Sequence, residues 1–150
     1  VQSRHLDGSA PVPDLVEIAE GPVPDRWLAM LATFQPPVAH HLSQVGRLFA
    51  RLPAASAFAV VHDEEGPAAI GRAVVENGHV GLFDVFTRPD RRRRGLASDI
   101  TLALLAWGAR NDASRAYLQV VPSNEAACRL YHQLGFRETY RYWYRVAPTG

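Results

Sequence analysis

The chain has 150 residues, of which 47% are hydrophobic and 21% are charged, a length and composition typical of one globular domain. Its formal net charge of +1 argues against a general polyanion-binding protein, although all 16 basic residues are arginines. The single cysteine, Cys128, excludes an internal disulfide, and no apolar stretch reaches the roughly 18 residues of a membrane span. With no secretory signal at its start, we expect a cytoplasmic protein without membrane association.

The amino-terminal part of the chain is expected to begin with a tail and to continue as helices. Residues 1–11 are polar and contain Gly and Pro, so we expect a flexible tail or linker stub, followed by a single domain over 12–150. Alternating polarity predicts a short strand at 15–19. Apolar residues at helical spacing then predict two helices, at 25–34 and 38–52.

The middle of the chain changes to a strand pattern. Apolar runs at 57–61 and 68–75 lie on either side of the turn residues 63–66 and predict a hairpin. Asn77-Gly78 is a strong hairpin-turn signal and leads to a third strand at 80–87. We therefore expect three consecutive antiparallel strands here.

The carboxyl-terminal part alternates between helices and strands. A long amphipathic pattern predicts one helix, and a second is expected to be capped by Ser123 and ended by Gly135. The predicted helices are 94–110 and 123–134, and the predicted strands are 116–121, 136–139 and 141–146.

A basic segment lies between the last of the three strands and the first of these helices. A helix N-terminus has unpaired N–H groups and the positive end of the helix dipole, which together attract anions. Gly95 would let the backbone approach a phosphate closely, and arginines add charge-assisted hydrogen bonds. A pyrophosphate site is one interpretation; a solvated basic run and a nucleic-acid-binding arm at 91–94 are the alternatives. The segment consists of Arg92, Arg93, Arg94, Gly95, Leu96 and Ala97.

A second pair of candidate residues lies on the predicted helix at 123–134. Asn124 and Tyr131 are seven residues apart, so two helical turns place them on one face. A phenol with an ordinary pKa of about 10 keeps its proton at neutral pH and can protonate a departing thiolate. The alternative is that Tyr131 is a core aromatic residue.

Taken together, these motifs resemble the GNAT superfamily of N-acetyltransferases. The resemblance extends over 15–146 and is sharpest over 82–136, from the arginine–glycine segment through Asn124 and Tyr131 to Gly135 and Phe136. It implies a GNAT-type α/β (α+β) fold, with a mixed central sheet of about seven strands, mostly antiparallel, flanked by about four helices. It also implies acetyl-CoA (coenzyme A) as co-substrate and no metal ion.

The resemblance also implies which residues bind the cofactor. Backbone amides of the arginine–glycine segment would bind the pyrophosphate, and the end of the strand at 80–87 would pair with the pantetheine arm and position the acetyl carbonyl. A backbone amide near Phe86 would hold the oxyanion, and Tyr131 would protonate the thiolate. The implied cofactor-binding residues are Val85, Phe86, Thr87, Arg92, Arg93, Arg94, Gly95, Leu96, Ala97, Asn124 and Tyr131.

The reaction needs a group that removes a proton from the amine, because an alkyl amine is mostly protonated at neutral pH. Asp84 is our first candidate for this catalytic role, beside Tyr131, since it lies on the strand that leads to the cofactor motif, where family members often carry an acidic residue. Capping, or pairing with an arginine, is the alternative for Asp84. Glu76 and His79 are further candidates for the base. Cys128 is interpreted as a small buried residue and not as a nucleophile.

The acceptor pocket is expected between the first two helices and the last strands. Trp27, Phe34, His40 and His41 are predicted to form one substrate-binding wall. The aromatic run at 140–145 would form the other wall, or belong to the core or to a homodimer interface.

From these residues we expect transfer of an acetyl group to a primary amine by direct attack in a ternary complex. The acceptor would be a small-molecule or protein amine, with no nucleic acid or membrane as partner. One alternative is a catalytically idle domain of the same fold that binds acyl-CoA as a sensor or partner domain. Another is a nucleic-acid-binding module that uses the arginines at 91–94, which would show steep salt dependence.

Overall fold

The computed structural model describes residues 1–7, 13–51 and 55–141. Their seven strands are β1 (Gln2–His5), β2 (Glu17–Glu20), β3 (Ala55–Asp63), β4 (Gly66–Glu76), β5 (His79–Thr87), β6 (Arg115–Leu118) and β7 (Arg137–Glu138). Their five α-helices are α1 (Asp25–Phe34), α2 (Pro36–Ala39), α3 (Leu42–Ala50), α4 (Leu96–Arg110) and α5 (Glu125–Gln133), and a 3-10 helix, η1, spans Pro89–Arg91. None of these helices has the length and apolar character to cross a membrane.

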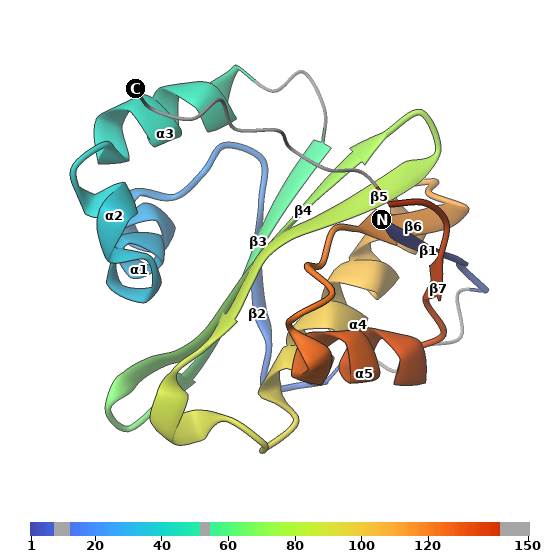
Figure 1. The fold of residues 1–150 in the computed structure, drawn as a ribbon. Helices are drawn as coiled ribbons and strands as arrows, with labels where there is room; N and C mark the ends of the chain where they lie inside the picture. Colours follow the sequence, from blue (N-terminus) through green and yellow to red (C-terminus); the bar gives the residue numbers. More distant parts are fainter. Residues whose placement is uncertain (8–12, 52–54, 142–150) are drawn as a thin grey trace, which may run out of the picture.

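The seven described strands form one sheet in the order β2-β3-β4-β5-β6-β1-β7. Neighbouring strands are antiparallel except β5 and β6, which run parallel. In Figure 1, α1, α2 and α3 lie on one side of the sheet, and α4 and α5 lie on the other. The predicted α/β (α+β) fold, a mixed and mostly antiparallel sheet with flanking helices, is confirmed, with five α-helices where about four were expected.

Two helices differ from the sequence prediction in where they begin or divide. The helix expected at 38–52 is two helices, because the main chain at His41 (φ −126°, ψ 18°) leaves helical geometry between α2 and α3. The helix expected from residue 94 begins at Leu96, because Gly95 has φ +81°, in the left-handed region. The spacing of apolar residues cannot predict such changes in main-chain conformation at a single residue.

The amino-terminal residues belong to the sheet. β1 lies between β6 and β7 and pairs antiparallel with both, Gln2 lying opposite Leu118 on one side and Glu138 on the other. Arg4 Nη1 donates to the Leu134 carbonyl at the end of α5, at 2.6 Å. The prediction of a flexible tail is therefore wrong for residues 2–5. The polar side chains of these residues give no strand pattern in the sequence, because main-chain hydrogen bonds on both edges hold this strand.

The carboxyl end supplies less strand than the sequence predicted. The strand expected at 136–139 is the two-residue β7, and Tyr140 and Arg141 lie outside any strand. The rest of the strand expected at 141–146 lies outside the described residues.

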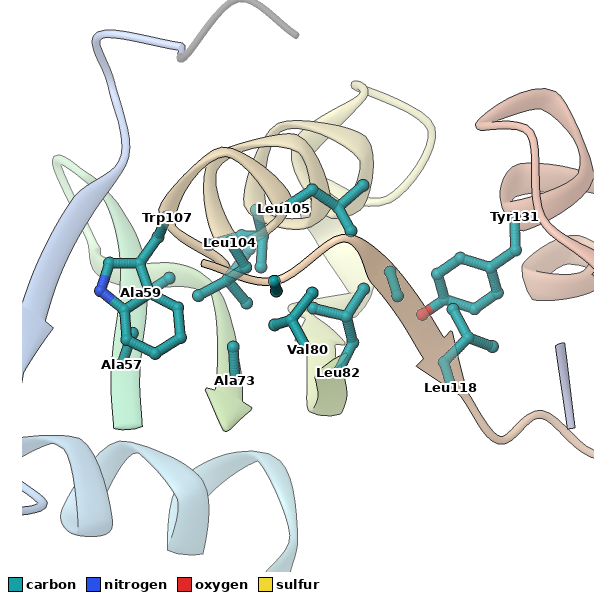
Figure 2. Close-up of a cluster of buried hydrophobic side chains, with 14 of the residues drawn as sticks. Ala57, Ala59, Ala73, Val80, Leu82, Leu104, Leu105, Trp107, Leu118 and Tyr131 are labelled. Carbon is teal, nitrogen blue, oxygen red and sulfur yellow. The ribbon is translucent and has the colours of Figure 1, made fainter. Parts of the chain in front are cut away.

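Small residues let α4 pack closely against one face of the sheet. Figure 2 shows Leu104 and Leu105 of α4 above Ala73, with Val80 and Leu82 beside them. A Cβ at Gly71 would lie 2.4 Å from Ile100 Cγ2, and one at Gly108 would lie 2.8 Å from the Val80 side chain. This close contact fixes α4, and therefore its N-terminus, relative to β4 and β5.

An aromatic cluster holds α1 and α3 on the opposite face. Trp27 of α1 is 2% exposed, packs against Phe58 and Phe49, and donates from Nε1 to the Ala59 carbonyl at 3.1 Å. Ile70 of β4 completes this second core beneath the helices. The two cores together place α4 on one face of the sheet and α1–α3 on the other.

Candidate functional site

Two neighbouring strands separate halfway along the sheet. Pairing between β5 and β6 ends at Leu82 and Leu118, while β5 continues to Thr87 and the chain after β6 turns toward α5 (Figure 1). The strand expected at 116–121 therefore stops at Leu118. Among the described residues, 83–87 have β4 on one edge and no strand on the other. Main-chain N–H and C=O groups along such an edge can bind an extended ligand.

A β-bulge bends β5 where the separation begins. Arg72 pairs with Phe83 and Ile70 with Phe86, so that Asp84 and Val85 together lie opposite Gly71 of β4. Asp84 has φ +53°, in the left-handed region that few non-glycine residues adopt. Bulges of this kind redirect side chains and end pairing beside functional sites.

The Asp84 carboxylate is paired with an arginine. Its Oδ2 accepts a hydrogen bond from Arg72 Nε at 2.9 Å. No described residue bonds its Oδ1, and the Asp84 side chain is 29% exposed while that of Arg72 is 10% exposed. Of the two roles considered for Asp84, pairing with an arginine is observed, and removal of a proton from the amine stays a prediction.

Tyr131 lies on α5 and reaches the point where β5 and β6 separate. Its ring packs edge-on against Phe136 at 5.8 Å, and Figure 2 shows its hydroxyl directed toward β6 beside Leu118. Burial raises the pKa of Tyr131 to about 12, so the phenol is protonated at neutral pH. No described residue hydrogen-bonds the hydroxyl, which leaves its proton available to a ligand.

Asn124 begins the same helix. It is the N-cap of α5, where its Oδ1 accepts from the Ala127 N–H at 3.1 Å, so the cap expected at Ser123 is wrong. The amide Nδ2 still extends from the exposed side chain as a donor. Cys128, one turn further, is half-buried and not fully buried, with its Sγ 3.8 Å from the Val121 carbonyl oxygen.

The arginine–glycine segment forms an open start to α4. Arg92, Arg93 and Arg94 are exposed, and none of them pairs with an acidic side chain of the described residues. Gly95 is the N-cap of α4, no side chain caps the helix, and a Cβ at Gly95 would meet nothing within 4 Å. The first N–H groups of α4 are therefore open to an anion, beside three free arginine side chains.

An ion-pair network anchors this loop to the β3–β4 turn. Arg88 Nη2 lies 2.6 Å from Asp63 Oδ2 and 3.0 Å from Glu65 Oε2, and Arg91 Nε also bonds Asp63 Oδ2. The hydrogen bond from Arg91 is the largest cause that lowers the pKa of Asp63 to about 2. Hydrogen bonds from the Glu65 main-chain N–H and from Arg88 add to it, and desolvation opposes them. The arginine run thus divides, because Arg91 binds the turn while 92–94 stay free. Sequence reasoning missed this anchor and assigned residues 63–66 only to turn formation.

The predicted acceptor wall is brought together only in part. Phe34 of α1 stacks on Phe86 of β5, with ring centroids 6.4 Å apart, so it lies at the free edge. Trp27 is buried in the aromatic core, and its role in substrate binding stays a prediction. His40 and His41 are exposed at the α2–α3 break, where His41 Nδ1 lies 2.8 Å from Gln44 Oε1.

The other candidate bases lie at the β4–β5 turn, at the opposite end of β5 from the free edge. Glu76 and His79 face each other across the β4–β5 turn, and His79 still pairs with Arg115 of β6. His79 Nδ1 lies 2.9 Å from the Asn77 carbonyl oxygen. Asp84 is therefore the acidic residue on β5 that lies beside the free edge.

A separate hollow of about 790 Å³ opens between residues 119–122, α5 and β7, with Cys128 and His132 in its lining. None of the predicted cofactor-binding residues lines it. The described residues contain no group of three His, Cys, Asp or Glu side chains that could hold a metal ion.

Comparisons with known proteins agree with this arrangement. A family model described as "Probable histone acetyltransferase Rv0428c C-terminal" matches residues 2–145. The chain is also similar to the uncharacterized N-acetyltransferase YobR of Bacillus subtilis (strain 168), with 31% identity over 99 residues. That match covers 66% of this chain and 40% of the relative, so the matched part is well under half of YobR.

Solved structures share the fold at low sequence identity. An aminoglycoside N-acetyltransferase, AAC(6')-Iy, in complex with the bisubstrate analogue CoA-S-monomethyl-acetylneamine, superposes with a TM-score of 0.68 at 20% identity, covering 89% of this chain and 99% of that one. A putative GNAT-family acetyltransferase from Novosphingobium aromaticivorans gives a TM-score of 0.66 at 24% identity, covering 92% and 59% of the two chains.

Proposed function

Since the chain belongs to the GNAT superfamily of N-acetyltransferases, in the family described as probable histone acetyltransferase Rv0428c C-terminal, we propose that it transfers an acetyl group from acetyl-CoA to a primary amine. The observation that carries the proposal is the free edge of β5. This edge begins where β5 and β6 separate, near the Tyr131 hydroxyl, and it leads to the open N-terminus of α4. An extended thioester ligand with a pyrophosphate needs these three features together.

The residues around the free edge fit coenzyme A. The N–H groups at Gly95, Leu96 and Ala97, with the Arg92–Arg94 side chains, would bind the pyrophosphate. Residues 85–87 would pair with the pantetheine arm. Thr87 Oγ1 is buried and has no hydrogen-bond partner among the described residues, which is an unsatisfied polar atom at the end of this edge. A polar ligand lying there would satisfy it.

Acetyl-CoA supplies the acetyl group as a thioester. The protein positions the two substrates and supplies one proton donor and one proton acceptor. The amine nitrogen bonds to the carbonyl carbon as the carbon–sulfur bond breaks. Tyr131 then gives its phenolic proton to the leaving sulfur, while Asp84 accepts the proton that the amine loses, directly or through water. A main-chain N–H near Phe86 would donate to the carbonyl oxygen as its negative charge develops.

Calorimetric titration of acetyl-CoA into the purified protein tests the cofactor site. We expect saturable binding by the wild type and a loss of at least tenfold in Gly95→Glu, because the substitution strains a left-handed residue and adds negative charge where the phosphates bind. Gly78→Glu is the matched control. Gly78 has φ +73° in the β4–β5 turn with equally open surroundings, and this variant should bind like the wild type. Failure of the folded wild type to bind would contradict the proposal.

The acceptor class is tested by release of the CoA thiol with two probe amines. One probe is neamine, because the fold-related AAC(6')-Iy was captured with an acetylneamine analogue, and the other is a lysine-containing histone-tail peptide, because of the family's name. Turnover with either probe, abolished by Gly95→Glu, supports acetyl transfer to that class of amine. Binding of acetyl-CoA without turnover on either probe favours the catalytically idle alternative.

A further inference from the structure

The bulge in β5 has a residue at its first position that does not favour the observed conformation. In bulges whose first residue is left-handed, that residue is usually glycine, because a Cβ is disfavoured there. Here the position is occupied by Asp84, at φ +53°. Another interaction must therefore hold the chain in this conformation.

Arg72 of β4 supplies that interaction from within the core. The residue is buried, and its guanidinium lies 4.2 Å from the ring centroid of Phe49 on α3 and 4.6 Å from that of Phe83 on β5. Two stacked rings restrict a planar guanidinium to one orientation. Its Nε then donates to Asp84 Oδ2 at 2.9 Å. A buried arginine that lost this carboxylate would be left as an unpaired charge, so each partner holds the other.

We propose that Arg72 is a positioning residue that latches the β5 bulge in its open, left-handed form and so keeps the free edge of β5 available to acetyl-CoA. The inference rests on the proposed function, since it assigns what holds that cofactor site open. Without the latch, Asp84 would relax toward ordinary strand geometry. The bulge would then move or disappear, and the shift in register would turn residues 85–87 away from their present positions.

Three variants separate the latch from a general loss of stability. Arg72→Met keeps the length of the side chain between the two rings but removes the donor. Asp84→Gly removes the acceptor but favours the left-handed conformation by itself. The double variant lacks both partners of the ion pair, and we expect its glycine at residue 84 to retain the conformation.

Calorimetric affinity for acetyl-CoA is the measurement, with melting temperature recorded beside it. We expect Arg72→Met to bind about tenfold more weakly than the wild type, Asp84→Gly to bind nearly as well, and Arg72→Met with Asp84→Gly to regain affinity. Because the double variant has lost the buried ion pair, its melting temperature should not recover in parallel.

Two outcomes would overturn the inference. Equal affinity of Arg72→Met and the wild type would show that the bulge needs no latch. A double variant that binds as weakly as Arg72→Met would show that the arginine acts through stability or charge and not through the Asp84 conformation. If the wild type itself does not bind acetyl-CoA, the proposed function fails; in that case a heteronuclear NMR comparison of the amides of residues 83–87 in Arg72→Met and Arg72→Met with Asp84→Gly still tests the latch.

Discussion

At the scale of single residues, the environment of each side chain decides the chemistry it can perform. Tyr131 and Tyr117 illustrate this, because burial raises the pKa of both phenols. Tyr117 packs edge-on against Phe83 in the sheet, with ring centroids 6.1 Å apart. The Tyr131 hydroxyl instead faces the place where β5 and β6 part. Position at the site, and not the perturbed pKa, distinguishes the two.

Replacing Tyr131 by Phe removes only the hydroxyl and keeps the ring packed against Phe136. We expect kcat for acetyl transfer to fall by about 10²–10⁴-fold, the usual contribution of a general acid, while the affinity for acetyl-CoA changes little. Steady-state kinetics and calorimetry check the two parts. The matched control is Tyr117→Phe, which should keep kcat near that of the wild type. Unchanged turnover in Tyr131→Phe would remove the residue from the mechanism.

The pKa of Tyr131 also predicts a pH dependence. Since burial raises this pKa to about 12, the phenol stays protonated and able to donate throughout the neutral and moderately alkaline range. We therefore expect no loss of kcat from this group as the pH rises from 7 to about 10, the ordinary tyrosine value. An alkaline limb with a midpoint near 10 that disappears in Tyr131→Phe would contradict this assignment.

At the scale of elements, contacts between residues outside the proposed catalytic pair set the position of the segment that precedes α4. The network of Arg88 and Arg91 with Asp63 joins the segment before α4 to the β3–β4 turn. Glycines at the contact between α4 and the sheet fix the helix itself. The loop is thus held from both sides.

Asp63→Asn is expected to weaken the anchor and to lower the affinity for acetyl-CoA severalfold. The pKa of Asp63 is depressed to about 2 in the folded protein, so its stabilising effect is present above the unfolded value of 3.8 and is lost as the pH falls through about 2. Melting temperature followed from pH 6 to pH 2 should therefore fall less steeply in Asp63→Asn. Glu64→Gln, in the same turn and outside this ion-pair network, is the control. Parallel pH profiles of wild type and Asp63→Asn would contradict the role of the network.

Gly71→Ala tests the close packing of α4. The new Cβ would lie 2.4 Å from Ile100 Cγ2, so the helix or strand must shift, and we expect a loss of about 1–3 kcal/mol in the free energy of unfolding. Gly46→Ala in α3 is the matched control, because its Cβ would meet only the flexible end of Leu28 at 3.0 Å. Denaturant unfolding compares the two, and equal stability of both variants would argue against the tight contact.

At the scale of the whole molecule, a segment from the start of the chain completes the sheet beside the site. β1 pairs with β6 along its whole length, and Gln2 and Ser3 also pair with β7 on the other edge. Ser3→Pro removes a main-chain donor from this pairing. We expect the free energy of unfolding to fall by about 1–3 kcal/mol and the melting temperature to fall with it. Asp14→Pro, in the turn closed by the Val16 N–H and the Pro13 carbonyl, should be nearly neutral. If Ser3→Pro leaves the free energy of unfolding unchanged, β1 does not belong to the cooperatively folded part of the protein.

The sequence by itself determined the order of most elements, because hydrophobic period and turn residues are local properties. The motifs around Gly95, Asn124 and Tyr131 are local too, and the family resemblance that they carry implied the mixed sheet. Tertiary structure alone decided that polar residues 2–5 are a strand, that Trp27 is core, and that the arginine run divides between an anchor and a free cluster. It also decided that Asp84 is bound by Arg72, twelve residues away across a bulge. These features depend on which groups meet across the sheet, and pairing between strands carries no periodic signal along the chain.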